Sequence, residues 1–531
     1  MDSIERSERS AYVRIPDRDA QDAGTVQAVG SVEVQTNETS NASPSPLLDS
    51  PQLETAVPQI AELPPEPSLF QVVAVWVLKD PAARLVAVAF CTCIYLTCMC
   101  IIAGVFNSFQ EEEKHSRRFL WGILTCGGAS VALAAWLGRN VPVEGLDQLE
   151  ELLPCTNPSI IPSERVVQLD YLVFAAVACV ILQSTNLDRP GGHAHNPTFL
   201  FEWAASFAEP WAMPSFAFSL GCYVRDARPT LDNCKRAMRV AAGYFVLQVV
   251  FFGFLQEFWL LKDSAEPGST TPYQADAWNV ITAIAQPIGP LWFVYALFIW
   301  KLLTPYWMEL QHPMSWAALW SLLCGFFVED AEGDTQRRVL TYLIYYVLGV
   351  VVAQENLPAM HKFISNPQVR AWGAVMLCLH ISVAWYLTHL GIDRQCNYFV
   401  GDKAYDQMHC STTDHHKANL TSYWPNVFVK LASIPVAVTL ILAFSALMPR
   451  SDSVIQRAGM RALCPYIFHY HFLLGIRKYT KWLDDWELKH SIPLYLCLAI
   501  YVWVLYLPIV YRVVSQIIFM PLDKMGIFKE D

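Results

Sequence analysis

Long apolar runs constrain this chain more than any other feature of its sequence. A helix needs about 17–25 mostly apolar residues to cross a bilayer, whose interior offers no partner for free backbone polar groups. Runs of that kind recur from residue 83 to residue 514. They predict an all-α polytopic membrane protein with about twelve transmembrane helices, near 83–106, 119–138, 167–185, 201–223, 238–261, 286–304, 312–328, 338–354, 370–390, 424–448, 460–476 and 491–514.

The composition supports a membrane protein. Hydrophobic residues make up 54% of the 531 residues and charged residues only 16%, whereas soluble domains carry about 25% charged residues. The mean hydropathy is +0.28. The formal net charge of -11 argues against nucleic acid as a partner, because phosphate binding needs clustered Lys and Arg.

Several polar side chains lie in or near the apolar runs. An ionised group in the middle of a bilayer costs at least about 2.5–3.5 kcal/mol, so we expect these side chains to face the bundle interior or a wet cavity. Any one of them alone more often makes a contact between helices, while a cluster would favour chemistry. They are Asp170, Glu202, Glu209, His380, His469 and His471.

The chain divides into three parts. Residues 1–66 are rich in Ser, Thr, Pro, Asp and Glu and poor in aromatic residues. Such a segment buries too little apolar surface to offset the entropy of ordering, so we predict a disordered cytosolic tail. Residues 67–160 are expected to form an N-terminal pair of transmembrane helices with a short interfacial helix. Residues 161–531 are expected to form a ten-helix membrane domain.

The loops predict the orientation. The connections 224–237 and 449–459 are basic, and short loops rich in Lys and Arg stay in the cytosol. The segment 355–369 then lies on the same side, as do both termini. The sequence Asn419-Leu420-Thr421 is a glycosylation sequon in the long loop 391–423 on the opposite side, which suits a secretory or plasma membrane.

Cysteine and histidine spacing gives weak signals. Cys396 and Cys410 share the loop 391–423 and could form one disulfide bridge. Three histidines near Asp414 in that loop could bind a metal, but an exposed polar loop is the simpler interpretation. With no zinc-ligand spacing in the sequence, we expect no metal site.

From about Arg165 to its end, the chain resembles the acyltransferase-3 family of integral membrane O-acyltransferases, whose core has ten spans. The resemblance rests on the joint order of short phrases over some 360 residues. The phrases are LDYLV (Leu169–Val173), MPSFAFSLG (Met213–Gly221), the pair Arg236-x-x-Arg239, GPLWFVYALFIWKLL (Gly289–Leu303), YLIYYVLGVVVA (Tyr342–Ala353) and CPYIFHYHFLL (Cys464–Leu474).

The chain departs from the family in its first core helix. Family members carry an Arg and, eleven positions later, a His that is taken to be the catalytic base. Here those positions hold Val173 and Ser184. A hydroxyl does not accept a proton at neutral pH, so another base is required. The candidates are His471, which stands at a family His position, His469, and the loop histidines His193 and His195. We predict a catalytic set of His471, Ser184 and Asp170.

The resemblance also implies a donor site. Arg236 and Arg239 share a helix face near its start, and a guanidinium group donates two hydrogen bonds to a phosphate at once. Together with Lys235 they could hold the phosphates of acyl-CoA, which we expect to be acetyl-CoA. The alternative is that these cations are cytosolic anchors that touch lipid phosphates.

The resemblance thus implies transfer of an acyl group from acyl-CoA to a hydroxyl of a carbohydrate or lipid-linked acceptor. Two alternatives come from other classes of protein. One is a catalytically inactive relative that binds coenzyme A, a glycan or a protein. The other is a twelve-span transporter, which the number of spans allows but which no two-fold repeat in the sequence supports.

Overall fold

The computed structural model describes residues 76–109, 113–140, 166–187, 199–224, 226–248, 287, 289–326, 333–389, 423–451, 453–470 and 488–524. The chain separates into two units, Met1–Leu63 and Pro64–Asp531. Every described residue belongs to the second unit. The predicted disordered tail, residues 1–66, lies outside the described residues.

All regular structure in these ranges is helical. Residues 76–79, 247–248 and 463–470 are helical segments. The others are α3 (Pro81–Phe109), α4 (Glu113–Asn140), α6 (Val167–Leu187), α7 (Phe199–Ala208), α8 (Ala212–Cys222), α9 (Leu231–Val246), α12 (Leu291–Glu309), α13 (Pro313–Leu323), η4 (Cys324–Phe326), α14 (Gly333–Val351), η5 (Val352–Asn356), α15 (Leu357–Ile364), α16 (Pro367–His389), α17 (Tyr423–Leu447), α18 (Val454–Gly459), α20 (Leu488–Leu505) and α21 (Pro508–Lys524).

Six of the described helices are long and apolar enough to cross a membrane. The number of candidate spans rises to as many as eight if each of two bent helix pairs counts as one span. The six lie in α3, α4, α6, α12, α16 and α17. The fold is therefore that of an all-α membrane protein, and the predicted number of twelve spans stays a prediction. The predicted span 201–223 is divided into α7 and α8, because Pro210 lacks the N–H that continues a helix.

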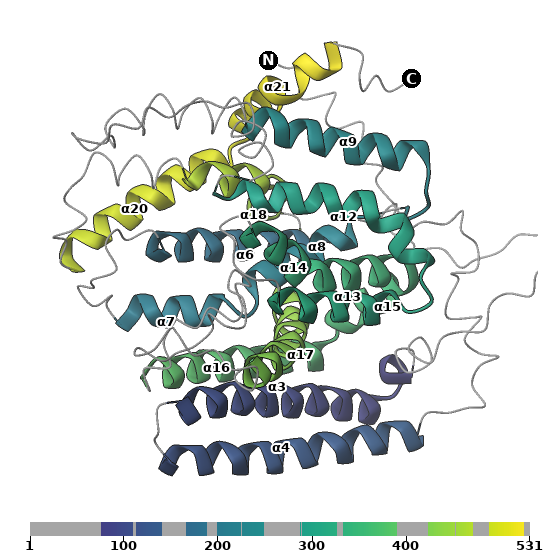
Figure 1. Ribbon diagram of the computed structural model, residues 1–531, viewed down its shortest axis with the longest axis vertical. Helices are drawn as coiled ribbons and strands as arrows, with labels where there is room; N and C mark the ends of the chain where they lie inside the picture. The colour runs from purple at the N-terminus through teal and green to yellow at the C-terminus, as the bar shows by residue number, and fades with distance from the viewer. Residues whose placement is uncertain are drawn as a thin grey trace, which may run out of the picture. The chain divides into compact units, whose positions relative to one another are not determined.

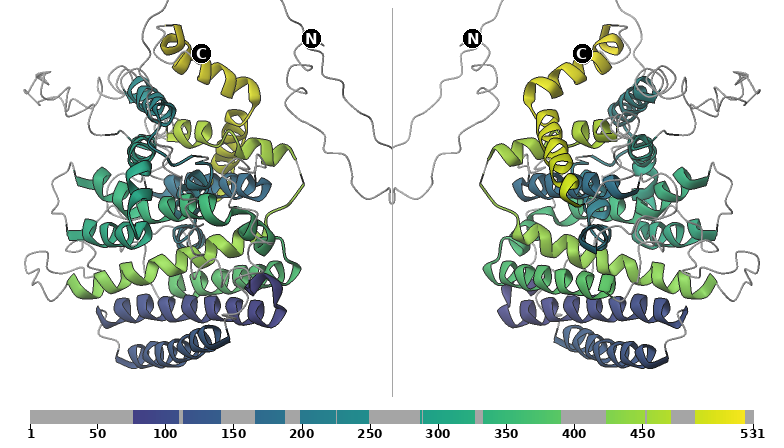
Figure 2. Two further views of the ribbon diagram at one scale, coloured as in Figure 1. Left: turned by 90° about the vertical axis from the view of Figure 1, so that its right-hand side faces the viewer. Right: turned by 90° about the vertical axis from the view of Figure 1, so that its left-hand side faces the viewer.

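The N-terminal helix pair packs on one side of the bundle (Figures 1 and 2). There α4 is the outer layer, and α3 lies between α4 and the pair α16 and α17. Polar contacts join α3 to α16. The Tyr95 hydroxyl lies 2.9 Å from His380 Nδ1, and Trp372 Nε1 donates to Thr92 Oγ1 at 2.9 Å. His380 thus makes a contact between helices, which was the more common role expected for such a residue.

Two glycines let α8 and α14 approach closely. A Cβ atom on Gly221 would overlap the carbonyl oxygen of Tyr346, and one on Gly349 would overlap that of Phe218. Small residues at such positions bring helix backbones into direct contact in membrane proteins. The two glycines belong to the phrases MPSFAFSLG and YLIYYVLGVVVA, so the structure gives both phrases a packing role.

A side chain at either glycine should separate α8 from α14. We expect Gly221→Val and Gly349→Val each to destabilise the protein by about 1–3 kcal/mol, the usual cost of overpacking a core. Thermal unfolding of the detergent-solubilised protein measures the effect. Gly128→Val on α4 is the matched control, because a Cβ there meets nothing within 4 Å. Equal stability of all three variants would contradict the close approach.

Candidate active site

Helix α6 carries polar groups near both of its ends. Asp170 lies in its first turn and Ser184 in its last. The fourteen residue steps from one to the other rise about 21 Å at 1.5 Å per residue. The two predicted catalytic residues therefore lie in different parts of the bundle, and each needs its own description.

Asp170 is fully buried and joins three helices. Tyr223, at the end of α8, donates its hydroxyl proton to Asp170 Oδ1 at 2.6 Å, and Gln456 of α18 donates from Nε2 to Oδ2 at 2.6 Å. A Cβ atom on Gly459 would overlap the carbonyl oxygen of Asp170, so α18 also touches the α6 backbone here. This network ties together the ends of α6, α8 and α18.

Three connections with a predicted cytosolic position meet at this end of the bundle. Gln354 Nε2 donates to the Val224 carbonyl at 2.9 Å, which joins the segment after α14 to the loop before α9. Arg450 donates to the carbonyl of Ser365. Tyr171 donates to the Ser451 carbonyl at 2.9 Å, which joins α6 to the loop after α17. We refer to this end as the basic end.

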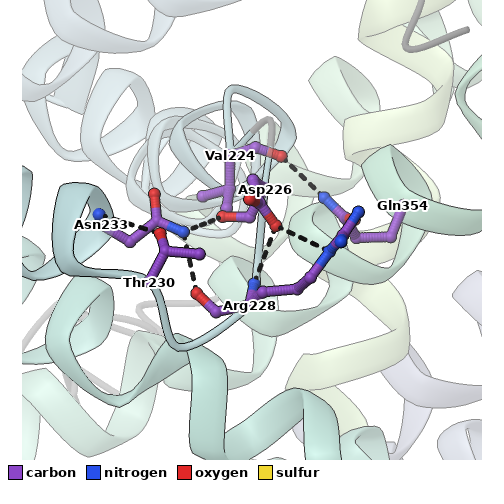
Figure 3. Close-up of polar contacts among 6 residues, drawn as sticks. All are labelled: Val224, Asp226, Arg228, Thr230, Asn233 and Gln354. Carbon is purple, nitrogen blue, oxygen red and sulfur yellow. Dashed lines mark hydrogen bonds and ion pairs between the residues drawn. The ribbon is translucent and has the colours of Figure 1, made fainter. Parts of the chain in front are cut away.

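The start of α9 is anchored by its own loop (Figure 3). Thr230 caps the helix by accepting from the Asn233 N–H at 3.3 Å. The Asn233 side chain donates to the carbonyls of Asp226 and Arg228 at 3.0 and 2.9 Å, and Arg228 lies 3.6 Å from the Asp226 carboxylate. These contacts fix the first turns of α9, on which the predicted donor residues lie.

The predicted donor residues are accessible there. Lys235 and Arg236 are exposed, and Arg239 is half-buried. Helix α9 packs against α12, where the charge of Arg236 acts on the partly buried Lys301. Two neighbouring helices thus bring positive groups together, which favours an anion at their junction.

Near the other end of α6, Ser184 meets a histidine. His469 Nε2 lies 3.1 Å from Ser184 Oγ, and His469 Nδ1 lies 2.6 Å from the carbonyl oxygen of Tyr466. His469 is 2% exposed. A ring nitrogen so close to a carbonyl oxygen must carry a proton, because two lone pairs would repel each other. In the neutral imidazole, Nε2 then presents its lone pair to Ser184.

This pair lines a cavity of about 300 Å³ between α6, α12, α14 and the helix 463–470. The volume is at the lower limit for small-molecule sites in proteins. Its polar lining residues are Gln183, Ser184, Glu209, Arg338 and His469, and its aromatic ones are Trp292, Tyr342, Tyr466 and Tyr470. Asp170 is not among the lining residues.

The break between two helices and the start of a third shape the cavity. Pro210 separates α7 from α8, and Glu209 lines the cavity at this break. Non-helical backbone at membrane depth is tolerated where it lines such a cavity. Gly289, with φ of 51°, precedes α12 and lies against the Tyr470 ring. Only glycine adopts this φ without strain.

Arg338 brings a positive charge to the cavity. Its guanidinium carbon lies 5.6 Å from the centre of the Trp292 ring, within the range of cation–π attraction. Trp292 in turn stacks on Tyr342, with ring centres 5.6 Å apart. The sequence interpretation missed Arg338. The signal that could have found it is the pair Arg337-Arg338, which directly precedes the apolar run of α14, because a charge at a membrane helix is a candidate for a functional site.

Other predicted residues lie outside the described ranges. These are His471, His193, His195, Asn419, Cys396 and Cys410, so the glycosylation and disulfide predictions stay predictions. Within the described ranges the cysteines are free, and no three His, Cys, Asp or Glu side chains gather as a metal site would require. The chain matches no family model, no curated protein and no solved structure.

The Asp170 network should contribute stability. We expect Asp170→Ala to cost about 1–3 kcal/mol for each buried donor that loses its acceptor. Thermal unfolding in detergent measures the loss. Glu309→Ala removes an exposed carboxylate from α12 and serves as the control, with an expected change within about 0.5 kcal/mol. A stable Asp170→Ala protein would mean that Tyr223 and Gln456 find other acceptors.

Proposed function

We propose that this protein is a membrane-bound acyltransferase. It moves an acyl group, expected to be acetyl, from acyl-CoA to a hydroxyl of a carbohydrate or lipid-linked acceptor. The observation that carries the proposal is the contact between His469 Nε2 and Ser184 Oγ at 3.1 Å, in a cavity inside the bundle. The resemblance to the acyltransferase-3 family supports the same class of reaction.

In this proposal His469 is the general base. Its Nδ1–H, held by the Tyr466 carbonyl, fixes the ring, so that Nε2 can take a proton from an attacking hydroxyl. Attack on the thioester carbonyl places negative charge on its oxygen. Arg338 and the Gln183 amide line the same cavity and can donate hydrogen bonds to that oxygen. Glu209 can bind a hydroxyl of the acceptor.

The donor would bind from the basic end, which we propose faces the cytosol, as do both termini. Arg236, Arg239 and Lys235 would hold its phosphates, with Lys301 as a further cation nearby. From Lys301 to Trp292, at the cavity, α12 rises about 13 Å. Since nine residues place these two side chains on opposite faces of α12, the pantetheine arm of the donor would have to cover this rise and also pass around the helix.

Loss of the base should abolish transfer. We expect His469→Gln to lower the rate of acyl transfer by about 10²–10⁴-fold, the typical contribution of general-base catalysis. Release of free coenzyme A from acetyl-CoA by the purified protein measures the rate. His312→Gln, at the exposed start of α13, is the matched control. Binding of acetyl-CoA by the unmodified protein with no turnover would instead support the inactive binding protein.

Loss of the phosphate ligands should weaken donor binding. We expect the double change Arg236→Gln and Arg239→Gln to raise the Kd for coenzyme A at least tenfold, because two charge-assisted hydrogen-bonding groups are removed. Calorimetric titration of the protein in detergent measures this. Arg457→Gln on α18, an exposed arginine at the same end, controls for the general loss of charge. Equal affinity of the double variant and the unmodified protein for coenzyme A would contradict the donor site and would favour lipid anchors.

A further inference from the structure

We propose that Ser184 is a nucleophile that carries the acyl group as a covalent ester between donor and acceptor. This inference rests on the proposed acyltransferase function and adds a chemical step to it. It starts from the position of the serine. Ser184 Oγ lies in front of His469 Nε2, the atom that acts as the base. It therefore occupies the position from which this base would accept a proton.

The hydrogen bonds define which proton His469 can accept. Ser184 Oγ lies 3.1 Å from His469 Nε2 and 2.9 Å from the Val180 carbonyl oxygen, so two acceptors compete for one hydroxyl proton. Since Nδ1 carries the proton that faces the Tyr466 carbonyl, Nε2 of the neutral ring has only a lone pair to offer. The serine hydroxyl is thus a ready donor to the base.

This arrangement has the three parts that activate a serine. A nucleophile lies within hydrogen-bond reach of a base, and a third group orients that base. Here the parts are Ser184, His469 and the Tyr466 carbonyl. A backbone carbonyl replaces the carboxylate of the better-known triads, and it fixes the same ring tautomer. An acceptor hydroxyl could reach Nε2 only by displacing Ser184.

The acylation step balances without any further reactant. Ser184 Oγ attacks the thioester carbonyl carbon while His469 Nε2 takes the hydroxyl proton. The carbon–sulfur bond then breaks, and His469 returns the proton to the departing thiolate, which releases coenzyme A with a free thiol. In the second half, His469 takes a proton from the acceptor hydroxyl, which attacks the Ser184 ester. Ser184 Oγ leaves and recovers the proton.

A covalent intermediate also suits the size of the cavity. At about 300 Å³ it is small for a pantetheine arm and a sugar hydroxyl together. With the acyl group on Ser184, the donor arm withdraws before the acceptor enters, so both substrates use one cavity in turn. This order predicts ping-pong kinetics.

Mass spectrometry tests the step. We expect incubation of the full-length protein with acetyl-CoA, without acceptor, to add one acetyl group, and digestion should place this group on the peptide that contains Ser184. Ser184→Ala should remove the label and slow transfer by at least about 10²-fold, whereas Ser184→Cys should keep the label as a thioester that hydroxylamine cleaves. Ser382→Ala on α16 is the matched control, because Ser382 also donates to the carbonyl four residues before it, at 2.9 Å, but does not line the cavity.

A fluorophosphonate probe separates this inference from the proposed function, because it reports an activated serine without any acyl donor. Labelling of Ser184 that His469→Gln abolishes supports the nucleophile. If the probe labels Ser184 but no acyl-CoA is turned over, the nucleophile stands and the donor assignment fails. If acetyl-CoA is turned over while Ser184→Ala keeps full activity and no acetyl-serine forms, the acyltransferase stands and the covalent step is overturned. If no serine is labelled and no acyl-CoA reacts, both fail.

Discussion

The direct contact of backbones between α8 and α14 governs the position of the cavity groups. Gly221 and Gly349 remove the side chains that would otherwise separate the two helices. As a result α14 brings Arg338 and Tyr342 close to the break before α8, where Glu209 lies. Helix α6 packs on the same α8 and adds Ser184. In a bilayer, where apolar surfaces gain little by leaving lipid, such close packing is the main force that holds helices together.

The bundle is chemically different at its two ends. At the basic end, a buried carboxylate, Asp170, joins three helices, and capped turns hold the cationic start of α9 in place. Near the other end, the polar groups line a cavity, and one of them, Glu209, lies at the break between α7 and α8. The first arrangement gives each oxygen of the Asp170 carboxylate a hydrogen-bond donor, which suits a structural role. The second leaves room beside reactive groups and suits chemistry.

Under the proposed resemblance to the acyltransferase-3 family, Ser184 stands at the position where members of that family carry a histidine. His469, from the last of the family-like phrases, lies 3.1 Å from that serine. An imidazole therefore stands beside the expected position although it comes from a distant helix.

The sequence by itself determined the class of the protein. Apolar runs predicted membrane helices, because a bilayer satisfies no backbone group, but they predicted one continuous span over 201–223, which the structure divides at Pro210. Tertiary structure alone decided the partners. Ser184 and His469 are 285 residues apart, and Asp170 and Gln456 are 286 apart. Apolar periodicity carries no information about which distant helices pack together, since lipid-facing and buried faces are equally apolar. The choice of His469, the roles of the two glycines and the separation of Asp170 from Ser184 follow from that packing.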